Sequence, residues 1–209
     1  MRSVNYGDDE HYDIVSAFIK SIRGSDPDAG VYWLARMIEA GEDARFIARR
    51  LVILASEDIG LADSQSILVA NAAARAVEYV GLPEAALNLA HAVIHLALAP
   101  KSNSVTSALG AATAAVRDRR SGPVPMHLRD SHYRGAQQLG HGAGYVYPHD
   151  APQGWVPQDH MPAEVAGERF YRPSSHGAEP GLFAALEARR RMGFTNEGSP
   201  EEAGEDVGR

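Results

Sequence analysis

The 209-residue sequence has no cysteine and no apolar run long enough to cross a membrane. Without cysteine, disulfide bonds, thiolate catalysis and cysteine-ligated metal sites are all excluded. The most apolar stretch, "AALNLAHAVIHLALAP", is interrupted by Asn88, His91 and His95 and is shorter than the roughly 20 residues of a transmembrane helix. The N-terminal "MRSVNYGDDEHYD" is polar and acidic, so no signal peptide is visible. We therefore expect a cytoplasmic protein without membrane contact.

Positive charge is also scarce in this chain. Lysine and arginine number 20 against 27 aspartate and glutamate residues, which gives a formal net charge of −7. Such a field does not favour nucleic acid, so any contact with phosphates would need a local basic patch. Apolar residues at 44% and charged residues at 22% are ordinary for a folded globular protein.

The pattern expected of a half-buried strand is missing, and helical periodicity takes its place. No segment alternates between apolar and polar residues for more than a few positions. Apolar spacing, together with glycine and proline stop signals, predicts seven helices. They are expected at residues 11–24, 27–41, 43–58, 64–80, 83–99, 104–120 and 181–192. The predicted fold class is all-α.

The stretch "KSIRGSDPDAGVYWLARMIEAGED", residues 20–43, predicts a tight corner between two helices. Gly24 is expected to end the first helix in the left-handed conformation, which glycine adopts without a Cβ penalty. Asp26 suits the N-cap of the next helix and Pro27 its first position. Gly41 is expected to end that second helix. The sequence therefore predicts two helices that meet at a fixed angle.

Composition changes after Gly122. From there to about Pro180, the chain accumulates proline, glycine, histidine and tyrosine. This is not a disordered composition, because its large aromatic side chains offer apolar surface to bury. A long irregular segment of this kind is expected to wrap over a core or to reach into a partner subunit. The last residues, "NEGSPEEAGEDVGR", are acidic and lack aromatics, which predicts a disordered tail.

Two histidines stand four residues apart in the fifth predicted helix. His91 and His95 have the spacing that places two imidazoles on one helix face for zinc. Ala92 follows His91, so the general base of a helical zinc protease motif is missing. Glu84 and Asn88 extend the histidine pair into one polar stripe, which is typical of a solvated or interface edge.

The second half offers another set of histidines in "LGHGAGYVYPHD". His141, His149 and Asp150 lie among glycines that do not match a phosphate-binding loop. They could be catalytic, but turn chemistry with aromatic anchoring explains them as well. Glu57 and Asp58 are adjacent in a predicted helix, so they are expected to point in different directions and to hydrogen-bond at a helix end.

A local excess of basic residues lies in the middle of the chain, opposed by only Asp118 and Asp130. These residues could contact DNA phosphates. Three of the arginines could instead complement the C-terminal end of the sixth predicted helix. The candidate DNA-contacting residues are Lys101, Arg117, Arg119, Arg120, Arg129 and Arg134.

Several long motifs carry a family resemblance. The segments "HYDIVSAFIKSIRGSDPDAGVYWLARMIEAGEDARFIARRLVILASEDIGLAD", "PKSNSV", "VPMHLRD", "YVYPHDAPQGWVPQDHMP" and "FYRPSSHGAEPG" closely resemble the C-terminal part of the replication-associated recombination protein A (RarA/MgsA) family. Members are AAA+ ATPases akin to clamp loaders. The resemblance runs in order from about Tyr6 to Met192.

This resemblance implies a domain organisation. Residues 1–56 correspond to the end of a helical lid region, residues 57–193 to a C-terminal helical oligomerisation domain, and residues 194–209 to an acidic tail. The corner at residues 20–43 resembles a helical hinge that relays the ATPase state to an oligomeric collar. The Walker A loop, Walker B strand, arginine finger and sensor arginine of the family's ATPase module are absent from this sequence.

The resemblance also implies a function. The family domain assembles as a homotetramer, and the full-length protein acts on DNA at stalled or damaged replication forks. We expect this chain to have no catalytic residue, metal or cofactor of its own, whereas ATP and Mg²⁺ serve the full-length protein. Expected partners are a second copy of the chain, DNA, single-strand DNA-binding protein and replisome components, in a nucleoid-associated setting.

Two function classes remain open from the sequence. The first is an assembly and DNA-interaction module of an ATPase. The second is a stand-alone helical enzyme or metal-binding protein that uses the histidines of the proline- and glycine-rich half. Candidate interface residues for the first class are His91, His95, Tyr145, Tyr147 and Trp155.

Overall fold

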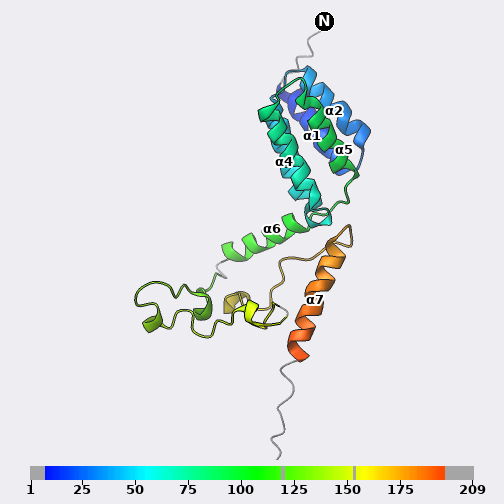
Figure 1. Ribbon diagram of the computed structural model, residues 1–209. Coiled ribbons are helices and arrows are strands. Elements are labelled where there is room, and N and C mark those ends of the chain that lie inside the picture. The colour runs from blue at the N-terminus through cyan, green and yellow to red at the C-terminus, as the bar shows by residue number, and fades with distance from the viewer. Residues whose placement is uncertain (1–7, 119–120, 153, 196–209) are drawn as a thin grey trace, which may run out of the picture. The chain divides into compact units, whose positions relative to one another are not determined.

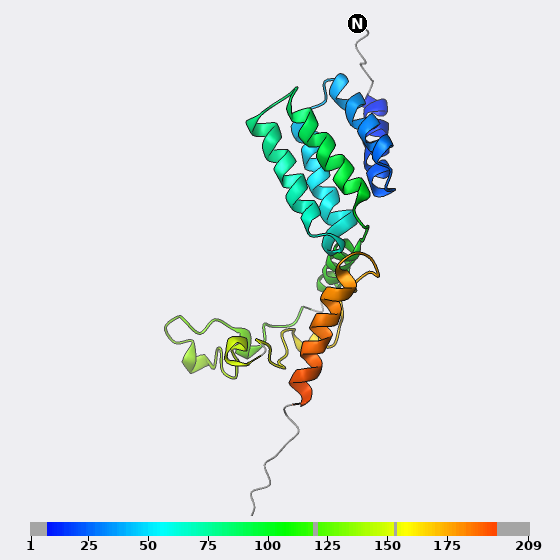
Figure 2. The ribbon, with the colours of Figure 1, turned by 45° about the vertical axis from the view of Figure 1, so that its right-hand side comes forward.

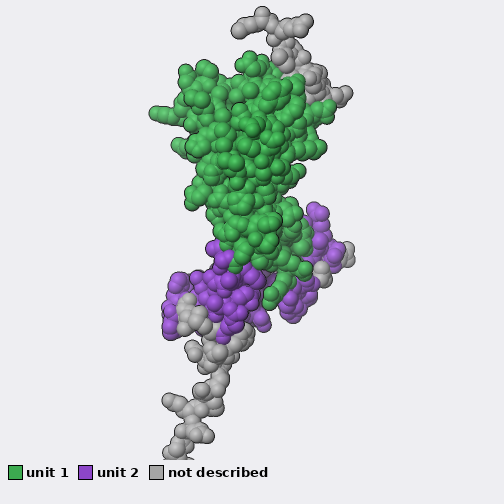
Figure 3. Space-filling view, turned by 90° about the vertical axis from the view of Figure 1, so that its right-hand side faces the viewer, with its two compact units in different colours: residues 1–112, 169–180 green, residues 113–168, 181–209 purple. Residues whose placement is uncertain are grey.

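The computed structural model describes residues 8–118, 121–152 and 154–195, and within these ranges it contains helices and turns but no strand (Figure 1). The all-α prediction is confirmed. The chain divides into two compact units, shown in separate colours in Figure 3. The first comprises residues 1–112 and 169–180, and the second comprises residues 113–168 and 181–209. The predicted boundary at residue 56 separates two regions of the family's proteins. The division into compact units does not test it, so this boundary stays a prediction.

The first unit is built mainly from five helices, which run side by side in Figures 1 and 2. α5 packs against each of the other four helices and is therefore the central helix of the bundle. Each of the five lies where apolar periodicity predicts one. Their bounds are α1 Asp8–Arg23, α2 Pro27–Glu39, α3 Ala44–Leu54, α4 Gln65–Tyr79 and α5 Ala85–Leu98.

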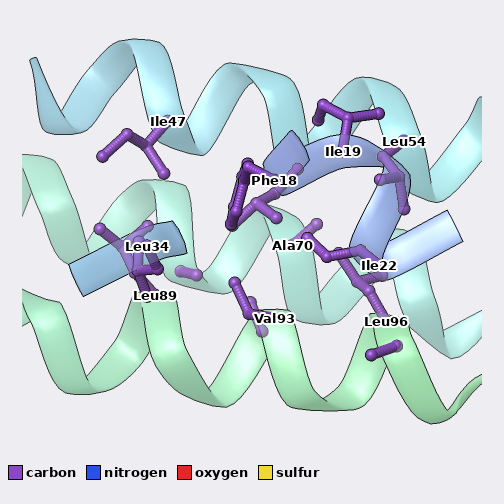
Figure 4. Packing of buried hydrophobic residues seen from close by; sticks show 14 of the residues in the cluster. Phe18, Ile19, Ile22, Leu34, Ile47, Leu54, Ala70, Leu89, Val93 and Leu96 are labelled. Carbon is purple, nitrogen blue, oxygen red and sulfur yellow. The ribbon is translucent and has the colours of Figure 1, made fainter. Parts of the chain in front are cut away.

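The core of the first unit is aliphatic, with one central aromatic ring. Figure 4 shows Phe18 among Ile22, Val93 and Leu96, side chains that α1 and α5 contribute. These four residues are completely or almost completely buried. Alanine at buried positions such as Ala92 lets neighbouring helix axes approach closely. Burial of this apolar surface is the main favourable term holding the bundle together.

The corner between α1 and α2 has the predicted capping but a different left-handed residue. Ser25 has a φ of 62°, whereas Gly24 does not lie in the left-handed region. The amide of Asp26 donates to Ser21 O at 3.0 Å and the amide of Ser25 to Ile22 O at 3.1 Å, the two bonds of a Schellman motif. Gly24 is therefore the C-cap residue of α1. The left-handed position falls on Ser25, one residue later than predicted. Asp26 caps α2 as expected, because its carboxylate accepts from the amide of Ala29 at 2.9 Å.

α3 continues into a π-helical turn, Ala55–Ile59, and a 3₁₀ turn, Gly60–Ala62. The expectation that Glu57 and Asp58 diverge is wrong. The Nε of Arg23 donates to Asp58 Oδ1 at 2.7 Å, and a terminal nitrogen of Arg23 contacts Glu57 Oε1 at 3.3 Å. The periodicity argument assumed an α-helix, whereas the π-turn changes the angular spacing of neighbouring residues, and the guanidinium is wide enough to bridge both carboxylates.

The second unit is mostly irregular. It receives the end of α6, Ser104–Arg117, and most of α7, Glu179–Thr195, whose bounds extend past both predicted ends. Between them lie four short 3₁₀ turns at Met126–Leu128, Gln137–Leu139, Pro148–Asp150 and Ala163–Val165. Tyr133, Tyr145 and Tyr147 remain about half exposed. The predicted tail, apart from its first two residues in α7, lies outside the described residues.

None of the described helices combines the length and the apolar character needed to cross a bilayer.

A close contact of α2 with α1 and α5 at Gly30 gives a stability prediction. Gly30 in α2 is buried, and a Cβ there would lie 2.9 Å from Val93 Cγ1 and 3.3 Å from Ile22 Cγ1. We expect Gly30→Val to lower the free energy of unfolding by about 2–3 kcal/mol through overpacking. Gly110 in α6 has open space around its Cα. Gly110→Val is the control and should stay within about 0.5 kcal/mol in urea denaturation. Equal stability of the two variants would contradict the packing.

Candidate functional site

Three distant segments of the chain meet in a polar junction on the first unit. We define this junction as Ala62, residues 101–104 and residues 174–179. The amide of Ala178 donates to Ala62 O at 2.9 Å, and His176 Nδ1 lies 2.8 Å from Lys101 O. Residues 169–180 thereby return to the unit that contains the helical bundle.

The centre of the junction is a buried carboxylate. Glu179 is fully buried, at 0% exposure, although it is charged and stands first in α7. Its Oε1 accepts from Ser102 Oγ at 3.0 Å and from Ser104 Oγ, and its Oε2 accepts from the amide of Ser174. Burial by itself raises the pKa of Glu179, but these hydrogen bonds outweigh burial and hold the pKa below its ordinary value. The junction therefore stabilises an ionised carboxylate.

Close backbone approach completes the junction. Gly177 has a φ of 56°, and a Cβ at this position would overlap the carbonyl of Ala62. Gly60 has a φ of 53°, and a Cβ there would lie 2.9 Å from Val105 Cγ2. Only glycine combines the positive φ with this lack of space. Gly177 lets residues 174–179 lie against Ala62, and Gly60 lets its turn lie against Val105 in α6.

Lys101, a predicted DNA contact, lies at the edge of this junction. Its ammonium donates to Ala97 O at 2.9 Å, Ala99 O at 2.6 Å and Ser25 Oγ at 3.1 Å. Burial lowers the pKa of Lys101, and the carboxylate of Asp58 offsets that effect only in part. All three N–H donors therefore have acceptors inside the first unit, and a phosphate would have to displace one of them.

The remaining basic candidates belong to the second unit. Arg117 is exposed in the last turn of α6, where a cation complements the helix C-terminus. Arg129 donates through Nε to Val124 O at 2.8 Å, and Arg134 is exposed. Arg119 and Arg120 lie outside the described residues. The proposed DNA contacts of all six residues stay a prediction, and the structure divides the set between the two units.

The two histidines of the predicted polar stripe on α5 lie in different surroundings. His91 is exposed, whereas His95 turns toward α4 and its Nε2 lies 3.0 Å from Asp63 Oδ2 and 3.3 Å from Ser66 Oγ. Burial raises the pKa of Asp63, but hydrogen bonds from Ser66, Gln65 and His95 lower it below its ordinary value. His95 therefore has an internal partner and does not share an outward face with His91.

The aromatic interface candidates lie in the second unit and have local partners. The rings of Tyr147 and His149 lie 5.1 Å apart, and the amide and carbonyl of Val146 bond the side chain of Gln158. Tyr145 is about half exposed and Trp155 is half-buried. Whether these residues meet another subunit stays a prediction.

The histidines of the alternative function have local partners. Within the described part of the chain, no three histidine, aspartate or glutamate side chains are placed to hold a metal ion. The Nδ1 of His141 lies 2.7 Å from the hydroxyl of Tyr133, and the ring of His149 is tilted against that of Tyr147. These contacts are those expected of turn chemistry with aromatic anchoring.

Sequence reasoning missed Glu179 and His176. The motif "FYRPSSHGAEPG" contains both residues, but its proline and glycine content suggested only irregular backbone. Neither residue has a local pattern that marks it, since their partners Ser102, Ser104 and Lys101 lie about 75 positions earlier.

Comparison with known proteins shows similarity to the C-terminal region of AAA+ ATPases. Residues 24–190 match the family model described as MgsA AAA+ ATPase C terminal. The chain is 56% identical over 184 residues to an uncharacterized AAA domain-containing protein of Mycobacterium tuberculosis, covering 88% of this chain and 41% of that protein. It is 50% identical over 169 residues to the replication-associated recombination protein A of Bacillus subtilis, covering 81% of this chain and 40% of that protein.

The protein of the same name from Escherichia coli K12 is 42% identical over 172 residues, which cover 82% of this chain and 38% of that protein. The chain thus spans about two fifths of the length of these relatives. The match covers the C-terminal region, and no ATPase module is part of it.

The buried carboxylate gives a prediction with a defined pH dependence. We expect Glu179→Gln to lower the free energy of unfolding at pH 7 by about 2–4 kcal/mol, because it removes a charged acceptor from two buried hydroxyl donors and one half-buried amide donor. The folded pKa of Glu179 lies below the ordinary 4.5. The stabilising contribution is therefore present above about pH 5 and is lost as the pH falls through the folded pKa.

Urea denaturation of both proteins from pH 7 to pH 3 measures this difference. Glu84→Gln, an exposed change at the start of α5, is the matched control and should stay within about 0.5 kcal/mol of the original chain. A gap between Glu179→Gln and the original chain that stays constant with pH would show that the charge does not stabilise the junction.

Proposed function

The chain belongs to the family of MgsA AAA+ ATPase C-terminal domains, and on this premise we propose that it is the assembly module of such an ATPase and contributes DNA contacts. The observation that carries the proposal is an exposed apolar row on the central helix α5. Leu87, Ile94 and Leu98 are 77%, 42% and 69% exposed, and His91 lies between them in the same row.

The spacing of this row suits a helix of another subunit. Positions 87, 91, 94 and 98 alternate steps of four and three residues, which places them along one face of the helix. The opposite face of α5 carries Leu89, Val93 and Leu96, which are fully buried in the bundle. A helix that packs on one face and leaves another apolar is typical of an oligomer interface.

We propose a homotetramer. Four identical subunits most often assemble through two-fold interfaces, in which the same patch contacts its own copy. An antiparallel pair of α5 helices would satisfy this symmetry and would bring the two His91 side chains near the axis. Tyr145, Tyr147 and Trp155 of the second unit are proposed as a further contact, since aromatic side chains are enriched at such interfaces.

Five of the six proposed DNA contacts belong to the second unit, and the sixth, Lys101, belongs to the first. Arg117 and Arg134 are exposed, and Arg119 and Arg120 follow Arg117 in the sequence. Exposed arginines of this kind would contact phosphates without reading base sequence. The relatives' name, replication-associated recombination protein A, fits a role in recombination at replication forks.

The remaining parts of the proposal concern the full-length protein. ATP and Mg²⁺ would serve its ATPase module, while the present chain would use no cofactor of its own. Single-strand DNA-binding protein and replisome components are proposed as its partners, with nucleoid association as the setting. The chain itself would act as a structural module rather than as an enzyme.

The assembly proposal predicts a mass. We expect light scattering coupled to size exclusion, at tens of micromolar, to give about four times the chain mass of 22.4 kDa. Leu87→Ser with Leu98→Ser should shift the mass to a dimer or monomer, because the interface loses its largest exposed aliphatic groups. Trp155→Ala should weaken assembly if the second unit also contributes an aromatic anchor.

A matched control removes similar apolar surface elsewhere. Leu109 and Val116 on α6 are 69% and 63% exposed, and Leu109→Ser with Val116→Ser should leave the mass unchanged. The α5 interface is wrong if the original chain is monomeric or if both double variants change the mass equally.

The DNA proposal predicts a salt dependence. Binding to duplex DNA should be sequence-independent, and replacing Arg117, Arg129 and Arg134 by alanine should reduce the slope of log K against log salt by roughly 0.9 for each lost contact. Fluorescence anisotropy at several salt concentrations measures the slope. Arg45, Arg49 and Arg75 of the first unit, replaced together, provide a charge-matched control. Unchanged binding by the first triple variant would assign its arginines to helix-end and loop contacts.

A further inference from the structure

A basic pocket lies between α1 and α3 of the first unit, on residues that the proposed function does not use. Its volume is about 440 Å³. Three of its lining residues are cations, although the chain as a whole has a net charge of −7. The full lining is Tyr12, Val15, Ser16, Ile19, Lys20, Arg23, Phe46 and Arg50.

Two of the three cations have no anionic partner among the described residues. Arg23 is paired with Asp58 and Glu57. Lys20 and Arg50 form no ion pair or hydrogen bond through their charged groups within the described part of the chain. The pocket therefore holds two uncompensated positive charges, beside one that is compensated.

Arg50 supplies the observation that points to a ligand. Its Nε is buried and has no hydrogen-bond acceptor among the described residues. Buried donors in native proteins almost always have an acceptor, so the unsatisfied Nε of Arg50, a residue that lines this pocket, points to a missing acceptor beside it. A guanidinium prefers an oxyanion, which can accept two parallel N–H donors.

The apolar part of the pocket narrows the class of oxyanion. Val15, Ile19 and Phe46 line its walls, and Tyr12, which is 71% exposed, also lines it. A phosphate ion alone would leave most of the volume and these side chains without contact. A phosphate that carries an organic group, above all one with a planar ring, would use both the cations and the aromatic side chains.

We propose that the α1–α3 pocket is a binding site for a phosphate ester, with the phosphate against Arg50 and Lys20 and the attached group against Phe46 and Tyr12. The phosphate can belong to a nucleic-acid strand or to a free phosphate ester, and the site chemistry is the same. The proposal is independent of the assembly and DNA contacts proposed above, because it uses none of their residues.

Phenyl phosphate is the probe, since it combines one phosphate with one planar ring. Titration of the whole chain, followed by calorimetry or by amide chemical shifts, should give saturable binding at least fivefold tighter than that of inorganic phosphate. Arg50→Gln and Lys20→Gln should each weaken the binding about tenfold. Lys20 is exposed, so Lys20→Gln keeps the test valid if Arg50→Gln fails to fold.

Arg49 provides the matched control, because it is the neighbouring residue of α3 and lines a different groove, between α3 and α4. Arg49→Gln removes the same charge and should change the affinity less than twofold. Competition by an eight-nucleotide thymidine strand would identify a strand as the source of the phosphate, and binding without competition would identify a free ester.

Three outcomes would overturn the site. They are no saturable binding of phenyl phosphate at 10 mM, equal losses in the Arg49 and Arg50 variants, or equal competition by phenol, which lacks the phosphate. Since inorganic phosphate and phenyl phosphate do not require assembly or the second unit, these outcomes are distinct from failure of the proposed function.

Discussion

The hydrogen bonds to the Glu179 carboxylate are the interaction on which the return of the chain to the bundle depends. A buried charge is costly unless donors surround it, and here two serine hydroxyls and one amide supply them. The donors come from the α5–α6 connection, from the first residue of α6 and from the segment just before α7. One carboxylate thus fixes the start of α7 to the helical bundle. The hydrophobic core of that bundle is a separate cluster, around Phe18 and α5.

The helices could be predicted from the sequence, because their determinants are local. Apolar periodicity and stop signals located all seven, with ends that differ by a few residues. The left-handed Ser25 and the π-turn after α3 could not be predicted, because tertiary contacts select these conformations. Ser25 accepts a hydrogen bond from Lys101, and the π-turn meets Arg23 from another helix. Both partners are distant in sequence.

For the candidate sites, the sequence indicates residues of suitable chemistry but not the contacts that these residues make. A basic residue in an acidic chain suggested phosphate contact at Lys101, yet its ammonium bonds three acceptors of the first unit. Arg50 carried no sequence signal, because one more arginine on an amphipathic helix looks like a solvated position. Its buried and unsatisfied Nε is seen only in the folded structure, where Arg50 lines the pocket between α1 and α3. The functional class follows from the family resemblance, because apolar periodicity predicts helices but not a function.

The first unit is formed by two separate stretches of the chain, which the second unit's residues 113–168 connect. Residues 113–168 leave the first unit and residues 169–180 return to it, so the intervening chain is a closed loop rather than a free end. The entropy of closing such a loop grows slowly, by roughly 0.6 kcal/mol for each doubling of length. Insertions within the loop are therefore inexpensive, whereas the returning segment tolerates little change. A single cut inside the loop would leave two fragments still joined by the contacts of Ala62, Ser104 and Glu179.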